Sequence, residues 1–168
     1  MPPISAETVE RVSDWLNRLE DEAALERLID EIAEAQPFLF AYLMAMGEGD
    51  FSEEERELLL FLGLSIYQMM KQDGAVLASV TEDHLDRLEQ QNMRMLEDLA
   101  DESEREFMQA ASGMLRDHPQ PEVLRHVIEE VTTQEEEDGV RPANHGILVV
   151  FLKIVIDCLH EAATTAEA

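Results

Sequence analysis

The chain has 168 residues, of which 45% are hydrophobic, and 38 acidic against 12 basic residues give it a net charge of −26. This size is typical of one domain with its own hydrophobic core, and the apolar content excludes a disordered acidic tail. The charge argues against direct binding of nucleic acid, which depends on neutralising phosphates with basic residues.

The sequence also predicts the compartment. The N-terminus lacks the basic and apolar stretches of a secretion signal, and no apolar run reaches the roughly 20 residues that cross a bilayer. The single cysteine, Cys158, lies in the most apolar segment, as expected of a buried thiol in a reducing environment. We therefore expect a cytoplasmic protein that does not enter the membrane.

Apolar residues recur every three or four positions through the first half of the chain, which indicates amphipathic helices. Ser5 is a suitable N-cap for the first helix, and Ser52 with Glu55 forms a capping box for the fourth. Gly74 is a suitable left-handed residue at the end of the fourth helix. The predicted helices cover residues 5–19, 25–32, 38–46 and 52–73.

The second half predicts four more helices and no convincing strand. Ser103 and Glu106 form another capping box, and Pro121 suits the first turn of the next helix. Residues 132–142 form an acidic loop that we expect to be mobile, and the C-terminus is expected to fray. These helices begin near Thr81, Ser103 and Pro121, and the last covers residues 144–161.

The last predicted helix organises the rest. Between residues 146 and 159 its only charged side chains are Lys153 and Asp157, which share one narrow stripe with His160. We expect that stripe to face water and the remaining faces, including Phe151, to be buried. Asn92 falls near the inner face of the fifth helix, where it can make a buried polar contact.

The prediction is thus an all-α, compact single domain over residues 1–168. About eight helices surround two strongly apolar core helices, about 52–73 and 144–161. No internal repeat of fixed period is found, which argues against a solenoid.

The search for catalytic chemistry gives one weak signal. Asp157 and His160 are three positions apart on one helix face, a spacing that can supply two metal ligands. This motif supports the hypothesis of a metal-dependent helical enzyme, although a structural hydrogen bond, or a His160 that faces solvent near the helix end, is the simpler explanation. The chain lacks paired-histidine, paired-cysteine and nucleophile-elbow motifs. We therefore predict no catalytic residue and no cofactor.

The favoured hypothesis is an acidic protein-interaction module, an adaptor or regulatory subunit. A possibly basic protein partner would bind an apolar groove or the acidic surface, and a homodimer is also possible. The alternative is an inhibitory decoy, immunity-like or mimicking nucleic acid, that occupies a basic site. The acidic residues predicted to contact a partner are Glu53, Glu54, Glu55, Glu135, Glu136, Glu137 and Asp138.

Overall fold

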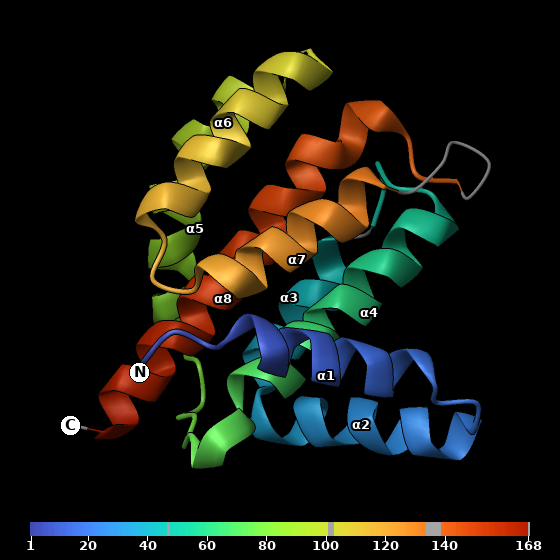
Figure 1. Ribbon diagram of the computed structural model, residues 1–168, viewed down its shortest axis with the longest axis vertical. Coiled ribbons are helices and arrows are strands. Elements are labelled where there is room, and N and C mark those ends of the chain that lie inside the picture. The colour runs from blue at the N-terminus through green and yellow to red at the C-terminus, as the bar shows by residue number, and fades with distance from the viewer. Residues whose placement is uncertain (47, 101–102, 134–138, 168) are drawn as a thin grey trace.

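The computed structural model describes residues 1–46, 48–100, 103–133 and 139–167, and it confirms the all-α prediction. Within these ranges the chain forms eight α-helices and no strand (Figure 1). Short 3₁₀ turns follow α4 (η1, Gln72–Gly74) and precede α8 (η3, Pro142–Asn144). The helices are α1 Ala6–Asn17, α2 Glu22–Ala35, α3 Pro37–Met46, α4 Glu53–Met70, α5 Glu82–Ala100, α6 Glu104–Asp117, α7 Pro121–Thr132 and α8 His145–Glu167.

Local signals in the sequence set the starts of several helices, as predicted. The Ser5 hydroxyl accepts a hydrogen bond from the Thr8 amide at the start of α1. Ser52 and Ser103 each form a complete capping box with the glutamate three residues later. Proline occupies the first position of α3 and of α7, where a backbone N–H would have no partner within the helix, so its absence costs no hydrogen bond.

The ends of the two core helices differ from the prediction. α4 stops at Met70, and the chain then closes the turn η1 at Gly74, whose φ of 76° is in the left-handed region. α8 continues as far as Glu167, beyond the predicted end at residue 161. The last turn, which we expected to fray, is therefore helical.

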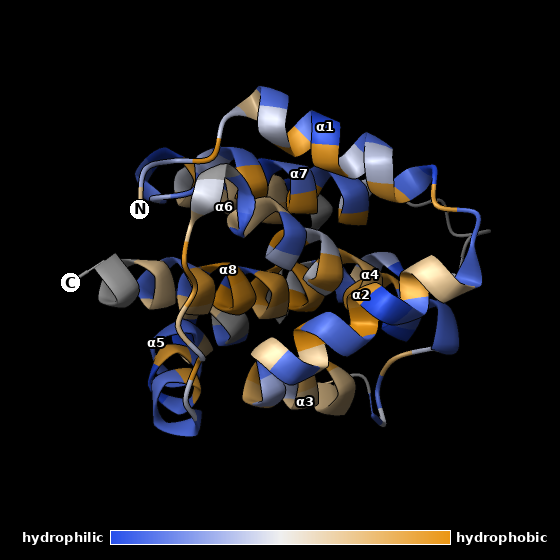
Figure 2. Cartoon of the chain, turned by 90° about the horizontal axis from the view of Figure 1, so that it is seen from below, coloured by the Kyte–Doolittle hydropathy of each residue, from blue (hydrophilic) through white to orange (hydrophobic). Residues whose placement is uncertain are grey.

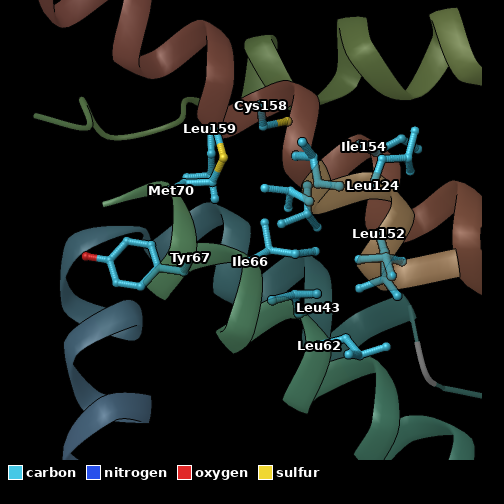
Figure 3. Packing of buried hydrophobic residues seen from close by; sticks show 14 of the residues in the cluster. Leu43, Leu62, Ile66, Tyr67, Met70, Leu124, Leu152, Ile154, Cys158 and Leu159 are labelled. Atoms are coloured by element: carbon cyan, nitrogen blue, oxygen red, sulfur yellow. The ribbon is translucent and has the colours of Figure 1, made fainter. Parts of the chain in front are cut away.

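α4 and α8 pack against each other in the middle of the molecule, as predicted (Figure 1). α5 and α7 cover α8, while α1 and α3 pack on α4. Figure 2 shows apolar residues concentrated on the central α8, whereas α1 and α5 present polar residues outward. Buried side chains from both helices meet in the core that Figure 3 shows, among them Leu62, Ile66, Leu152 and Ile154. Each of these four contributes roughly 1.5–3 kcal/mol by burial.

Phe151 is only partly buried, although the sequence predicted it to lie in the core. Its ring makes edge contacts with Tyr42 and Phe51, at centroid distances of 6.5 and 6.1 Å. Edge-to-face packing of this kind is favourable for aromatic rings, but these two contacts leave part of the Phe151 ring exposed. The fully buried residue next to it, Leu152, is the better measure of how much α8 contributes to the core.

Candidate functional site

The predicted acidic patch at the start of α4 divides into exposed and buried parts. Glu53 and Glu54 are exposed, whereas Glu55 has no exposed surface. One Glu55 carboxylate oxygen accepts two hydrogen bonds from Arg141, at 2.8 and 3.0 Å, and the other accepts one from Asn144 at 2.8 Å. Glu55 therefore joins the starts of α4 and α8 and is not available to a partner, which corrects the prediction for this residue.

Similar contacts hold the described end of the predicted acidic loop. The Gly139 carbonyl accepts a hydrogen bond from the Ser52 hydroxyl at 3.2 Å, and Val140 is buried. Residues 139–142 are therefore anchored, where the sequence predicted mobility. The remaining acidic candidates, Glu135, Glu136, Glu137 and Asp138, lie outside the described residues and stay a prediction.

The hydrogen bonds of Glu55 decide its ionisation. Burial alone would raise the pKa of Glu55, but bonds from the Ser52 amide, Arg141 and Asn144 outweigh it and hold the pKa below its ordinary value. A carboxylate with a depressed pKa in the folded state stabilises the fold above its unfolded pKa, at about 4.3. That stabilisation is lost as the pH falls through the folded value.

Glu55→Gln should therefore remove part of the acid sensitivity of the fold. We expect the wild type to be the more stable at about pH 7, and the difference to shrink below about pH 4.5, where Glu55 begins to protonate in the unfolded chain. Urea unfolding at a series of pH values measures this difference. Glu53→Gln, at an exposed neighbour, is the control and should leave the curve unchanged. A pH-independent difference between Glu55→Gln and wild type would contradict the assignment.

The predicted pair of metal ligands on α8 does not converge. Asp157 is hydrogen-bonded to Lys153 at 2.7 Å and to His118 at 2.8 Å, while His160 pairs with Gln120 at 3.2 Å. Among the residues that the structure describes, no group of three or more His, Cys, Asp or Glu is placed to hold a metal ion. The described residues therefore provide no set of ligands that would support the hypothesis of a metal-dependent enzyme.

The polar stripe of α8 faces α5, where the sequence predicted that it would face water. The Lys153 and Asp157 side chains are only 13% and 15% exposed, and Lys153 donates to the Asn92 side-chain oxygen at 2.8 Å. Burial alone would raise the pKa of Asp157, but the His118 hydrogen bond and the Lys153 charge hold it below its ordinary value. Asn92, His118, Lys153 and Asp157 form what we call the polar cluster, an internal network between helices.

The geometry of the polar cluster is unsuited to acid–base catalysis. His118 Nδ1 accepts a hydrogen bond from the Gln120 amide at 3.0 Å, so the ring proton lies on Nε2, which donates to Asp157. Both ring nitrogens are engaged and the side chain is 3% exposed, so neither nitrogen can reach a substrate. Nearby Cys158 is fully buried, and burial raises its pKa to about 12, so almost no thiolate forms at neutral pH.

A different surface has the character of a binding site. α2 carries an apolar stripe of Leu25, Leu28, Ile29 and Ile32, of which only Ile32 is fully buried, while Leu28 and Ile29 are partly buried against the core. Leu25 is 37% exposed and lines an apolar groove of about 510 Å³ with Ile29 of α2 and with Leu58 and Phe61 of α4. We call this surface the α2–α4 groove. Its apolar floor is left partly uncovered by the chain itself, which is typical of a docking surface.

The borders of the α2–α4 groove are acidic. Glu54 and Glu57 project from the first turns of α4 at its edge, and both are exposed. A second recess of about 310 Å³ lies on the other side of Leu60, between α3 and α4, where exposed Met44 contributes to its lining. Of the predicted acidic residues at the start of α4, Glu54 thus lines the groove and Glu53 the neighbouring recess.

The sequence predicted an apolar groove as one possible partner site but did not place it. Leu25 and Ile29 are four apart on α2, and Leu58 and Phe61 are three apart on α4, so periodicity predicts only that each helix has an apolar face. Periodicity shows which face of a helix is apolar but not what covers that face. One signal was available, because the first turns of α4 carry four acidic residues directly before these apolar positions.

Comparison with known proteins adds no family to this description. The chain matches no protein-family model, and searches of curated proteins and of solved structures find no significant similarity. In the part of the chain that the structure describes, no helix has the length and apolar content to cross a membrane. The class defined by fold and surface is therefore an acidic, all-α bundle with an apolar groove between two of its helices.

Proposed function

We propose that the protein is an interaction module that binds one amphipathic, basic helix of a partner protein in the α2–α4 groove. The observation that carries this proposal is the apolar face of α2, of which only Ile32 is fully buried and Leu25 is exposed in the groove. The groove lies between two helices, and a third helix can place an apolar ridge along such a surface. The described residues contain no strand, so they offer no sheet edge for an extended peptide.

The charge of the proposed partner follows from the rim. Glu54 and Glu57 flank the apolar floor, and the whole chain carries a net charge of −26. Lysine or arginine beside the apolar face of the ligand would match this rim and speed its association. Affinity would come mainly from apolar contacts with Leu25, Leu58 and Phe61, and specificity from the acidic border.

Designed peptides test the proposal directly. The probe is a helical peptide with leucines at positions i, i+3, i+4 and i+7 and lysines elsewhere. One comparison peptide has the same composition in scrambled order, and another keeps the leucines but carries glutamates in place of the lysines. Fluorescence anisotropy gives each Kd at about 0.05 and 0.5 M salt, across which the Debye length falls to about 4 Å. We expect tight binding of the probe alone, only partly weakened by salt.

Paired protein variants locate the binding site. Leu25→Lys places a charge on the groove floor and should weaken binding of the probe at least about tenfold, the equivalent of 1.4 kcal/mol. Met108→Lys introduces the same charge at a similarly exposed apolar residue on α6 and should leave binding unchanged. Equal effects of the two variants would exclude the groove as the site.

The other functions give different results in the same assay. A decoy that presents only acidic charge would bind the scrambled peptide as well as the probe, and it would lose both at high salt. A homodimer that uses the groove would appear as a self-associated species in sedimentation, and the probe or Leu25→Lys would dissociate it. If neither peptide nor a second copy binds, the interaction proposal fails.

A further inference from the structure

Two buried glutamines hold backbone segments in the same way, and Gln120 also pairs with His160 Nδ1 at 3.2 Å. Gln36 accepts a hydrogen bond from the Val80 amide at 2.8 Å and donates to the Ala78 carbonyl at 2.9 Å. Gln120 accepts one from the Ile4 amide at 2.8 Å and donates to the Pro2 carbonyl at 3.1 Å. Both glutamines are completely buried, and each directly precedes a proline that starts a helix. Each side chain therefore binds the backbone of an extended segment as a neighbouring strand would.

The two bound segments are equivalent in sequence. Ile4 and Val80 are 76 positions apart, as are Pro2 and Ala78. At the same spacing, residues 4–12 (ISAETVERV) and 80–88 (VTEDHLDRL) show apolar, hydroxyl, acidic and basic residues in nearly the same order. The apolar positions are also buried alike in the two segments. These are Ile4, Val9 and Val12 in the first segment and Val80, Leu85 and Leu88 in the second.

The helices that follow these segments start in the same way. The Ser5 hydroxyl accepts from the Thr8 amide at 3.2 Å, and the Thr81 hydroxyl accepts from the His84 amide at 3.2 Å. Beyond them the order of packing repeats. In the first half of the chain α1 packs on α4, α2 on α3, and α3 on α4. In the second half the corresponding helices pack in the same pairs, α5 on α8, α6 on α7, and α7 on α8. The two apolar helices that end the series, α4 and α8, pack against each other.

We propose that the chain is a tandem pair of one four-helix unit, in which Gln36 and Gln120 are recognition sites for the extended segment that begins the other unit. The first unit spans residues 2–74 and the second residues 78–163. Each unit's glutamine binds the opposite unit, so the contacts are reciprocal, as in the interface of a two-fold homodimer. Each glutamine site binds an extended backbone segment in which a buried apolar residue is followed directly by a serine or threonine that caps the next helix.

This arrangement explains why the sequence shows no fixed period. The bound segments are 76 positions apart, whereas the two glutamines are 84 positions apart. Most of the difference arises because α5 has 19 residues where α1 has 12, and the connections between helices account for the rest. His118, a member of the polar cluster, lies between α6 and Gln120 in a short connection that has no counterpart between α2 and Gln36.

Exchanging the two segments tests their equivalence. In the exchange variant, residues 3–7 (PISAE) take the sequence SVTED and residues 79–83 (SVTED) take PISAE. Because the glutamines contact backbone atoms and the apolar and hydroxyl residues keep their places, we expect a wild-type urea midpoint and a single unfolding transition. The exchange also places proline at residue 79, which is tolerated only if that backbone is extended like that of Pro3.

The control keeps the composition but breaks the register. Ile4→Ser combined with Ser5→Ile moves the apolar side chain out of the core and the hydroxyl away from the N-cap, so its urea midpoint should fall clearly below that of the wild type. An exchange variant with a midpoint as low as that of this control would overturn the equivalence of the two units.

Hydrogen exchange tests the recognition sites separately. Gln120→Met keeps the length of the side chain but removes its hydrogen bonds, and should quicken exchange of the Ile4 amide by about two- to tenfold. Gln36→Met should do the same to the Val80 amide, and each variant should spare the amide that the other affects. The assignment would be overturned if exchange became faster throughout the chain, or if the exchange rate of the Ile4 or Val80 amide did not change in the matching variant.

Discussion

Replacing Leu152 by alanine is expected to lower the free energy of unfolding by about 2–5 kcal/mol. Leu152 is completely buried on α8, within the core formed with α4 (Figure 3). Alanine removes apolar contacts and leaves a cavity that the surrounding helices fill only in part, because the interior is closely packed. Urea unfolding followed by circular dichroism measures the loss, and an unchanged slope with denaturant would show that the unfolded state is not altered.

The matched control is Leu25→Ala, the same substitution at a leucine that is 37% exposed in the α2–α4 groove. We expect a loss below about 1 kcal/mol, because much of this side chain is already in water. Equal losses at the two leucines would show that α8 does not have the central place assigned to it. A small loss at Leu25 also confirms that groove variants stay folded in the binding assay.

Replacing Asp157 by alanine is expected to cost about 3–5 kcal/mol of stability. The change leaves the charge of Lys153 in the interface between α5 and α8 without its carboxylate partner and removes the acceptor of His118. Neither group can turn to water without opening the helix packing, because both side chains are largely buried. Thermal and urea unfolding should agree on the loss.

An exposed ion pair provides the comparison for Asp157. Arg125 donates to Glu122 at 2.7 Å at the surface of α7, and Glu122→Ala should cost less than about 1 kcal/mol because Arg125 stays in contact with water without its partner. Asp157→Asn keeps the shape and one hydrogen-bond acceptor, so its loss should lie between the other two. Asp157→Ala as mild as Glu122→Ala would show that the polar cluster is open to solvent.

Local signals account for much of what could be predicted. The capping boxes at Ser52 and Ser103, the proline at residue 121 and the apolar run after His145 each depend on a few neighbouring residues, and the structure bears them out. Such features follow from backbone chemistry that does not need the rest of the fold. The fold class and the two core helices could therefore be predicted from the sequence.

The errors concern residues whose partners are distant in the chain. Glu55 was interpreted as an exposed partner contact, but its hydrogen bonds come from Arg141, 86 residues later. The stripe of Lys153 and Asp157 was assigned to water because its cover is Asn92, 61 residues from Lys153. A helical pattern gives the chemistry of each face, whereas the choice between water and another helix is made by tertiary packing.

The candidate site was harder to predict than the fold. The only local signal of the α2–α4 groove is the group of acidic residues at the start of α4, because a leucine stripe looks the same whether covered or open. The two glutamine sites have no local signal. Gln36 and Gln120 also look like ordinary polar residues before a proline. Only the contacts with Val80 and Ile4 show their role.

The bond between Gln120 and Ile4 also has a consequence for synthesis of the chain on the ribosome. These residues are 116 positions apart, so the N-terminal segment emerges long before the side chain that holds it. At translation rates of about 5–20 residues per second, that delay is about 6–23 s. Throughout this interval Ile4 lacks its final hydrogen-bond partner. The Ser5 cap of α1 can form early because it is local, whereas the segment before α1 is fixed only when Gln120 has been made.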